Sequence, residues 1–343
     1  MCCFGYMLKK LIGSDLRELQ EIALSYGMPR FSGKQIADWI YKKKVRSIDD
    51  MTNLSKSFRE RLSADYCIGV SGYSSVTESS DGTRKYLFPV EGAGAVETVM
   101  IPDAERRTLC VSSQNGCKMN CSFCMTGRNG FRGDLDPARI ISQFLAVDET
   151  DSLTNAVFMG MGEPLDNYDA VMRCIEILTS DWGFAWSPKR ITVSTVGMLP
   201  SLKKFLDESK CHLAVSLHNP FDKERAAMMP VQKAYPISDV VALIREYDFS
   251  GQRRVSFEYT MFAGVNDSER HCNSLIAMLS GIECRVNLIR FHRIPGSNLS
   301  PSSDAVMERF RDRLNAHGIV CTVRASKGED IFAACGMLAG KKD

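Results

Sequence analysis

The sequence predicts an α/β protein in which a six-stranded parallel (βα)6 barrel follows a helical segment and a short β extension. Three observations lead to this class. Strand-like apolar runs alternate with amphipathic helical runs from about residue 108 onward, polar side chains gather where the strand-like runs end, and the first 66 residues show only helical patterns. Such alternation is typical of a parallel sheet whose strands are joined by helical crossovers.

Residues 1–66 are predicted to form a helical accessory domain. The stretch "SDLRELQEIALSYG" offers Ser14 as an N-cap and Gly27 as a C-cap. The segment has 12 Lys and Arg against 8 Asp and Glu, whereas the whole chain has a net charge of only +2. Its basic run "YKKKVR" lies beside aromatic residues, which fits RNA docking but also fits a solvated helix end.

The later parts of the chain are expected to form three further regions. Residues 67–104 are predicted as a β extension or linker, because "TRKYLFPV" and "AVETVMIP" are strand-like and lie between glycine-containing turns. The barrel is expected over 105–326 and a C-terminal tail over 327–343. The predicted barrel strands are 108–114, 155–160, 190–196, 212–218, 254–262 and 286–292, and a seventh apolar run covers 318–326.

Polar residues follow almost every predicted barrel strand. "CKMNCSFC" follows the first strand and "GMGEP" the second, and the later strands end in Ser194 and Thr195, in Ser216 and His218, and in His292. In α/β barrels the loops at the C-terminal ends of the strands build the active site. We therefore expect an active site at the barrel mouth, with "CKMNCSFC" in it.

The composition is that of a globular protein, with 44% hydrophobic and 24% charged residues. No apolar run approaches the roughly 18 residues of a membrane span, and the first residues lack the features of a signal peptide. We therefore expect a cytoplasmic protein. The 13 cysteines are an odd number and cannot all pair. In a reducing compartment most are expected to be small buried residues.

The stretch "CKMNCSFC" places Cys117, Cys121 and Cys124 close together without a fourth cysteine. Zinc sites and iron–sulfur clusters normally take four protein ligands. Three thiolates can hold three corners of a 4Fe-4S cluster and leave the fourth iron to an external amine and carboxylate. The alternative is a zinc site with a distant fourth ligand, as in a non-catalytic zinc-bound RNA-binding module. The position of the three cysteines, after the first barrel strand and before "GMGEP", favours the cluster.

The stretch "GMGEP" is a candidate ligand-binding turn. Gly160 and Gly162 allow the backbone to approach a ligand closely, and Glu163 can accept a hydrogen bond from an ammonium group. A plain turn with a solvated glutamate is the alternative.

Several longer motifs together resemble the RNA adenosine methyltransferase family of radical S-adenosylmethionine (SAM) enzymes, the RlmN/Cfr family. They are "VETVMIP", "TLCVSSQNGCKMNCSFC", "FMGMGEPLDN", "VSTVGMLP", "AVSLHNP", "MMPVQKAYP", "GVND" and "GEDIFAACGMLAG". The resemblance implies a radical SAM partial (βα)6 barrel. The proline in "GMGEP" is more similar to the RlmN branch, which methylates carbon 2 of adenine, than to the branch that methylates carbon 8.

The resemblance also implies a chemistry. Carbon 2 of adenine is electrophilic, so direct methyl transfer from a sulfonium fails. Cys335 would take a methyl group from one SAM, and a 5′-deoxyadenosyl radical from a second SAM would remove a hydrogen from that methyl. The carbon radical would add to the ring, and Cys110 would then attack the Cys335 sulfur, forming a transient disulfide and releasing the RNA. Glu97 would be the acid/base carboxylate near the base.

For SAM binding the resemblance implies residues at four strand ends: Gly162, Glu163, Ser194, Ser216, Leu217 and His218, with His292 where the family usually has an asparagine. Imidazole can still offer adenine a donor or an acceptor. The family's "ACGQLAG" is "ACGMLAG" here, so Met337 replaces an amide that could position the tail. The expected substrates are adenosines in 23S rRNA and tRNA, the expected electron source is an external reductant such as flavodoxin, and the chain is expected to be a monomer.

Overall fold

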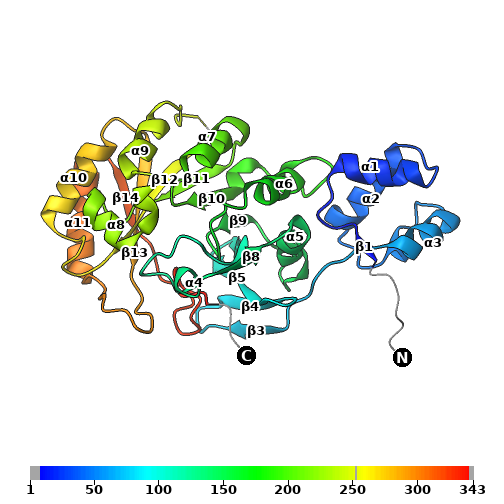
Figure 1. The fold of residues 1–343 in the computed structure, drawn as a ribbon, viewed down its shortest axis with the longest axis horizontal. Coiled ribbons are helices and arrows are strands. Elements are labelled where there is room, and N and C mark those ends of the chain that lie inside the picture. The colour runs from blue at the N-terminus through cyan, green and yellow to red at the C-terminus, as the bar shows by residue number, and fades with distance from the viewer. Residues whose placement is uncertain (1–7, 252, 340–343) are drawn as a thin grey trace. The chain divides into compact units, whose positions relative to one another are not determined.

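The computed structural model describes residues 8–251 and 253–339, which form two compact units (Figure 1). The first unit comprises the described residues up to Tyr73 together with 135–150 and 169–187. The second comprises 74–134, 151–168 and 188 onward. Each unit is described separately below. Among the helices that the structure describes, none has both the length and the apolar character that crossing a bilayer demands.

The first unit is mainly helical. Its elements are β1 Lys9–Lys10, α1 Leu16–Ser25, α2 Phe31–Ala37, the π-helix η1 Asp38–Lys42, the 3-10 helix η2 Ile48–Asp50, α3 Lys56–Asp65, β2 Tyr66–Cys67, α5 Pro137–Ala146 and most of α6 Tyr168–Thr179. The N-cap of helix α1 is Asp15, not the predicted Ser14. The Asp15 side chain accepts from the Glu18 N–H at 2.7 Å, and the Glu18 carboxylate accepts from the Asp15 N–H in return.

The C-terminal half of the basic run "YKKKVR" is held in place by contacts within the first unit. Lys43 lies 3.5 Å from the centroid of the Trp39 ring, and Lys44 Nζ donates to the Thr150 carbonyl at 2.6 Å. Arg46 donates to the Leu145 carbonyl. These contacts hold part of the run against residues 135–150 of the same unit, while Lys42 and Lys43 stay at the surface.

The second unit is built on one ten-stranded sheet. Its strands are β3 Ser75–Glu78, β4 Arg84–Val90, β5 Gly94–Asp103, β6 Arg106–Cys110, β9 Asn155–Phe158, β10 Ile191–Thr195, β11 His212–Ser216, β12 Val255–Met261, β13 Cys284–Arg290 and β14 Val320–Val323. They lie side by side in chain order. Pairing is antiparallel from β3 to β6 and parallel from β6 to β14. The sheet has free edges at β3 and β14, so it is a partial barrel.

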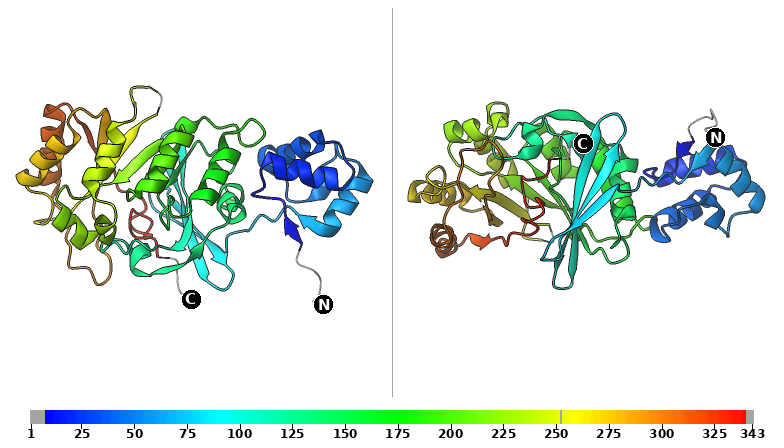
Figure 2. Two further views of the ribbon diagram at one scale, coloured as in Figure 1. Left: turned by 45° about the horizontal axis from the view of Figure 1, so that its top comes forward. Right: turned by 90° about the horizontal axis from the view of Figure 1, so that it is seen from below.

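The other elements of the second unit are short strands and helices. They are β7 Gln114–Gly116, α4 Met125–Arg128, β8 Phe131–Asp134, the 3-10 helices η3 Pro188–Arg190 and η4 Pro230–Lys233, α7 Leu199–Glu208, α8 Asp222–Met228, α9 Ile237–Arg245, α10 Glu269–Leu279 and α11 Asp304–Ala316. Figures 1 and 2 show α7, α9, α10 and α11 side by side on one face of the parallel strands. These helices alternate with the strands, as the sequence predicted.

The centre of the sheet is fully buried. Leu213 and Val215 of β11, Phe257 of β12 and Val286 and Leu288 of β13 have at most 1% of their surface exposed. Burying one such side chain stabilises the fold by about 1.5–3 kcal/mol, and continuous apolar runs are typical of parallel strands covered on both faces.

The predicted α/β class, with its barrel, helical N-terminal segment and β extension, is confirmed. The first barrel strand ends earlier than predicted, at Cys110, because residues 114–116 leave the sheet to pair with β8. The β extension is continuous with the barrel sheet through the pairing of β5 with β6. The predicted domain boundaries at 66, 104 and 326 stay predictions.

Candidate active site

The cysteine loop runs from the end of β7 to the start of α4. Gly116 has a φ of +79°, and a Cβ there would lie 1.8 Å from the Gly130 carbonyl oxygen. Only glycine therefore allows β7 and β8 to meet at this point. The loop that follows carries three thiols, those of Cys117, Cys121 and Cys124, and all three line one cavity with a volume of about 160 Å³. We call it the cysteine cavity.

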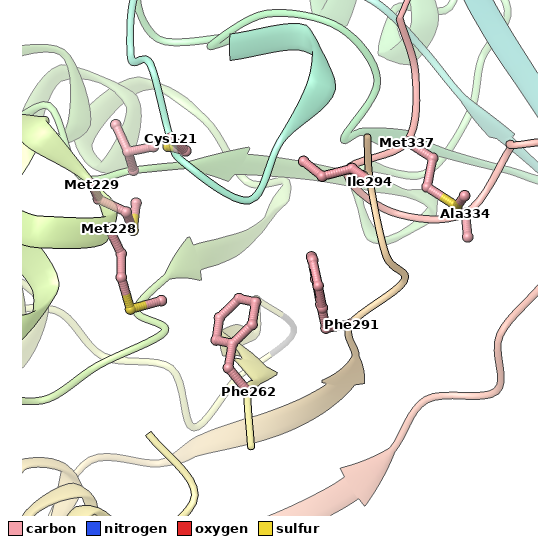
Figure 3. Packing of buried hydrophobic residues seen from close by; sticks show 9 residues of the cluster. Cys121, Met228, Met229, Phe262, Phe291, Ile294, Ala334 and Met337 are labelled. Carbon is pink, nitrogen blue, oxygen red and sulfur yellow. The ribbon is translucent and has the colours of Figure 1, made fainter. Parts of the chain in front are cut away.

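The wall beside Cys121 is apolar. Cys121 belongs to a buried cluster that includes Met228, Met229, Phe262 and Phe291, with Ala334 and Met337 from the C-terminal tail (Figure 3). Burial raises the pKa of the Cys117 thiol to about 12 and that of Cys121 well above its ordinary value. Thiolates in such a place need a compensating positive charge.

A cluster of several metal ions bound to these thiolates would supply the compensating positive charge. Among the described residues, no group of three or more His, Cys, Asp or Glu side chains is arranged to hold a metal ion. The three thiols nevertheless share one sulfur-rich cavity, and soft thiolate ligands favour iron–sulfur clusters. The donor set therefore fits a 4Fe-4S cluster held by the three cysteines.

The strand-end residues meet the cysteines in the same cavity. Gly162 and Glu163 follow β9, Ser194 belongs to β10, and Ser216 and His218 lie at the end of β11; all line the cysteine cavity. The structure therefore brings together five of the seven residues that the sequence predicted for SAM. Leu217 is fully buried behind the cavity, with its N–H donating to the Glu258 carbonyl at 3.1 Å. His292 lies in a neighbouring cavity.

Glu163 is a buried carboxylate held by backbone amides. One oxygen accepts from the Val196 N–H at 2.9 Å and the other from the Leu165 N–H at 3.1 Å. Burial raises the pKa of Glu163 to about 7, although these hydrogen bonds favour the charged form. The preceding Gly162 has a φ of +102°, and a Cβ there would lie 2.5 Å from Gln114 Cβ. The glycine lets the chain pass close to Gln114 and turn the carboxylate toward the cavity.

His218 is a neutral imidazole with a defined tautomer. Its Nδ1 accepts from the Thr260 N–H at 2.9 Å, so Nε2 carries the proton. Burial, and then the charge of Arg225, lower the pKa of His218 to about 3. The Phe123 ring lies edge-on to the imidazole at 4.9 Å between centroids. His218 can therefore offer Nε2–H as a fixed hydrogen-bond donor.

Two residues at the site escaped the sequence analysis. Arg225 of α8 is fully buried and donates to the carbonyls of Val196, Ser216 and Leu217 at 2.9–3.0 Å. Its sequence neighbourhood, "DKERAAM", gave no signal, because it has the composition of an exposed helix. Glu258 also lines the cysteine cavity. A carboxylate inside the apolar run "RVSFEYTMF" was a signal that could have been used.

The second cavity, of about 150 Å³, contains the other two predicted catalytic cysteines and is called here the thiol cavity. Cys110 and Cys335 both line it, together with His292 and Arg324. Cys335 also lines the cysteine cavity, so this residue borders both spaces. Both thiols are free in the structure, so the implied disulfide is not formed here. Burial raises the pKa of the Cys110 thiol to about 12.

Backbone hydrogen bonds hold the tail that carries Cys335. The Gly336 carbonyl accepts from the Met125 N–H at 2.8 Å, and the Leu338 carbonyl accepts from Thr126 Oγ1 at 2.6 Å. Met337 is only 7% exposed, so its thioether fills the apolar cluster where the family's amide would be. Side-chain burial and main-chain bonds thus position the tail without that amide.

The tail also reaches Glu97. The Ala339 N–H donates to Glu97 Oε2 at 2.7 Å, and Lys85 Nζ lies 3.1 Å from Glu97 Oε1. Glu97 is buried on β5, but it lines neither the cysteine cavity nor the thiol cavity. His292 is likewise tied to the tail, with its Nδ1 at 3.0 Å from the Glu329 carboxylate. These two predicted site residues contact the tail in this conformation.

Comparisons with known proteins agree with the motifs. Residues 111–272 match the model of the radical SAM superfamily, and residues 9–68 match that of the ribosomal RNA large subunit methyltransferase N-terminal domain. The probable dual-specificity RNA methyltransferase RlmN of Porphyromonas gingivalis strain W83 is 57% identical over 332 residues, which cover 97% of each chain. The dual-specificity RNA methyltransferase RlmN of Psychrobacter arcticus is 40% identical, over 96% of this chain and 88% of that protein.

A solved structure resembles the whole chain. The crystal structure of a radical SAM methyltransferase from Sphaerobacter thermophilus matches with a TM-score of 0.91 and 38% identity. The match covers 97% of this chain and 100% of that one.

Proposed function

The chain belongs to the RlmN family of radical SAM RNA methyltransferases, and we propose that it methylates carbon 2 of adenosine in 23S rRNA and tRNA through a methylated Cys335. Membership in the superfamily implies a 4Fe-4S cluster and SAM as cofactors. The observation that carries the proposal is the position of Cys335, a residue that lines both the cavity of the three cysteines and the cavity of Cys110.

Cys117, Cys121 and Cys124 would hold the cluster, leaving one iron for the amine and carboxylate of SAM. When bound, the cluster supplies the electron that cleaves SAM. Around it, the chain's own residues bind and orient the cofactor. Glu163 accepts from the ammonium group of SAM, and Ser194 and Ser216 offer polar contacts at the strand ends.

His218 contributes a fixed donor. Since its Nδ1 is occupied by the Thr260 amide, its Nε2–H is free to donate to SAM. Arg225 holds the carbonyls of Val196, Ser216 and Leu217, so it positions the two loops on which these contacts depend.

Cys335 is the methyl acceptor. Its sulfur forms a bond to the SAM methyl carbon, the sulfonium–methyl bond breaks, S-adenosylhomocysteine leaves, and the thiol proton is lost to solvent. After the methyl-derived carbon has been joined to the adenine ring, Cys110 attacks the Cys335 sulfur. The sulfur–carbon bond breaks with its electron pair left on the carbon, which takes up a proton equivalent to the one that Cys110 loses. A disulfide forms, and the methylated base is released. A dithiol reductant returns the disulfide to two thiols by exchange, and an external reductant such as flavodoxin supplies the electron for SAM cleavage.

Glu97 would remove the proton from carbon 2 of the ring. Its carboxylate now accepts from the tail at Ala339, so this part of the tail has to move before the base can reach Glu97. The first unit, with its basic run at Lys42 and Lys43, would dock the RNA and present a base that is turned out of its stack.

Analysis of modified nucleosides tests the reaction. Mass spectrometry of rRNA and tRNA from cells with and without the gene should show 2-methyladenosine only when the gene is present. Its persistence without the gene would contradict the proposal. A product with the methyl group at carbon 8 would instead assign the chain to the family branch that methylates carbon 8 of adenine.

The assigned roles of the two cysteines have a sharper test. In Cys110→Ala the attack on Cys335 is lost, so anaerobic turnover should leave RNA covalently attached to Cys335, detectable as a shifted protein band. Cys211→Ala is the matched control, since Cys211 is also buried and lines neither cavity. Free RNA alone from Cys110→Ala, or attachment that survives in Cys110→Ala/Cys335→Ala, would contradict these roles.

A further inference from the structure

A large cavity lies at the end of the barrel away from the predicted active-site loops. It has a volume of about 570 Å³. Asn155 at the start of β9, Arg190 just before β10, His212 at the start of β11 and Arg254 just before β12 all line it. The cavity therefore lies at the N-terminal ends of strands whose C-terminal ends carry the SAM-site residues. We call it the basic cavity.

The lining of this cavity is strongly cationic. Besides Arg324 and His212, the basic side chains are Arg106, Lys189, Arg190, Arg254 and Lys327, whereas Asp103 is the one carboxylate in the lining. In the described part of the chain, none of these five cations makes an ion pair with a carboxylate. A group of neighbouring cations without carboxylate partners is expected at a site that binds anions.

The lowered pKa of His212 is a second indication of positive charge in this lining. Its pKa is lowered first by burial, and then by Arg254, Lys189, Arg253 and Arg285. Its Nδ1 accepts from the Arg254 N–H at 3.0 Å, so the neutral ring carries its proton on Nε2. The cations around it disfavour a further positive charge, and the imidazole adds a neutral donor to the lining.

The basic cavity shares a wall with the thiol cavity. Ile101, Arg324, Ala325 and Lys327 line both spaces. Three of these residues belong to the segment that leads from β14 into the tail carrying Cys335. An anion bound in the basic cavity would thus be separated from the thiol cavity by these shared lining residues.

We propose that the basic cavity binds backbone phosphate groups of the RNA substrate. This inference rests on the proposed function, because it takes the thiol cavity to be the place where an RNA base reacts. RNA fits better than an acidic protein partner. A single extended strand can follow the lining that the basic cavity shares with the thiol cavity, whereas a folded protein would contact only exposed cations such as Arg190 and Arg254. Charge and shape here give affinity without base specificity.

RNA binding at varied salt concentration tests the proposal. The variant is Arg190→Gln/Arg254→Gln, because both side chains are exposed and unpaired, and the probe is a fluorescent, unmodified tRNA transcript bound to the reconstituted full-length enzyme. We expect affinity to fall about tenfold or more at 0.1 M salt, and the slope of log K against log salt to become shallower by about one to two units. Lys203→Gln/Lys204→Gln on α7 removes the same charge elsewhere and should leave both quantities unchanged.

Each outcome decides the question. An unchanged slope in Arg190→Gln/Arg254→Gln, and in the second variant Lys189→Gln/Lys327→Gln, would overturn the proposal. So would a variant that loses affinity for inorganic phosphate or for flavodoxin while keeping its affinity for tRNA. Formation of 2-methyladenosine by the unmodified enzyme is measured alongside. If that product forms while the slopes are unchanged, only this inference fails; if it does not form, the proposed function itself fails.

Discussion

At the scale of single residues, Glu163 combines burial with a role that requires charge. Its carboxylate has 3% of its surface exposed, and burial raises its pKa to about 7. Two backbone amides, of Leu165 and Val196, fix its orientation. An ammonium group arriving in the cysteine cavity would stabilise the charged form, so cofactor binding and deprotonation of Glu163 are linked.

Replacing Glu163 by Gln should weaken SAM binding. Hydrogen bonds to charged groups contribute about 1.5–3 kcal/mol, so affinity for S-adenosylhomocysteine should fall about 10- to 100-fold, measured by calorimetry on the reconstituted protein. Because the folded pKa is about 7, affinity in the unmodified enzyme should decrease as the pH falls through 7, where the carboxyl becomes protonated. The variant should lack this dependence.

Glu105→Gln serves as the control for that measurement, since Glu105 is exposed and lines neither cavity. Equal affinity in Glu163→Gln and the unmodified enzyme at pH 8 would contradict the assigned contact.

At the scale of elements, the short helix α8 ties together two strand ends. Arg225 donates to a carbonyl after β10 and to two at the end of β11, and its Nη1 donates to Gln232 Oε1 at 2.5 Å. Burial lowers the pKa of Arg225 to about 10, so the side chain stays charged at neutral pH. One buried cation thereby fixes the backbone just after Ser194, and at and just after Ser216.

Arg225→Met should destabilise the fold, because it leaves buried carbonyl oxygens without donors. The expected loss is about 3 kcal/mol or more, seen as a fall in Tm of about 6–10 °C for the protein without its cofactors. Arg309→Met, on the exposed side of α11, should leave the Tm within about 2 °C. An unchanged Tm in Arg225→Met would show that these hydrogen bonds do not hold the two loops.

The same elements show what sequence could and could not predict. The alternation of apolar runs gave the parallel sheet, and the spacing of Cys117, Cys121 and Cys124 gave the cavity that they share. Arg225 was missed because a buried cation satisfied by distant carbonyls has no local pattern. The predicted N-cap was wrong by one residue. Ser14 and Asp15 both suit a cap, but only Asp15 has a glutamate three residues later, Glu18, to complete a capping box.

At the scale of the whole chain, the tail returns to the region where the barrel sheet begins. Ala339 bonds to Glu97, 242 residues earlier, and Cys335 stands between two cavities. The proposed chemistry needs Cys335 near SAM first and near the RNA base and Cys110 later. A tail held by a few backbone bonds and by the burial of Ala334 and Met337 is suited to local release without unfolding of the sheet.

Met337→Ala should therefore loosen the tail more than the rest of the molecule. Truncating a buried methionine costs about 2–5 kcal/mol, and here the loss falls on the docking of residues 327–339. Hydrogen exchange measured by mass spectrometry should become faster at the Ala339 amide, which donates to Glu97, and at the Met125 amide, which donates to Gly336. Met307→Ala truncates another buried methionine, on α11, and should lower the Tm while leaving exchange in the tail unchanged. Equal protection of the Ala339 amide in Met337→Ala and the unmodified protein would mean that the backbone bonds alone hold the tail, and that Met337 does not take over the positioning role of the missing amide.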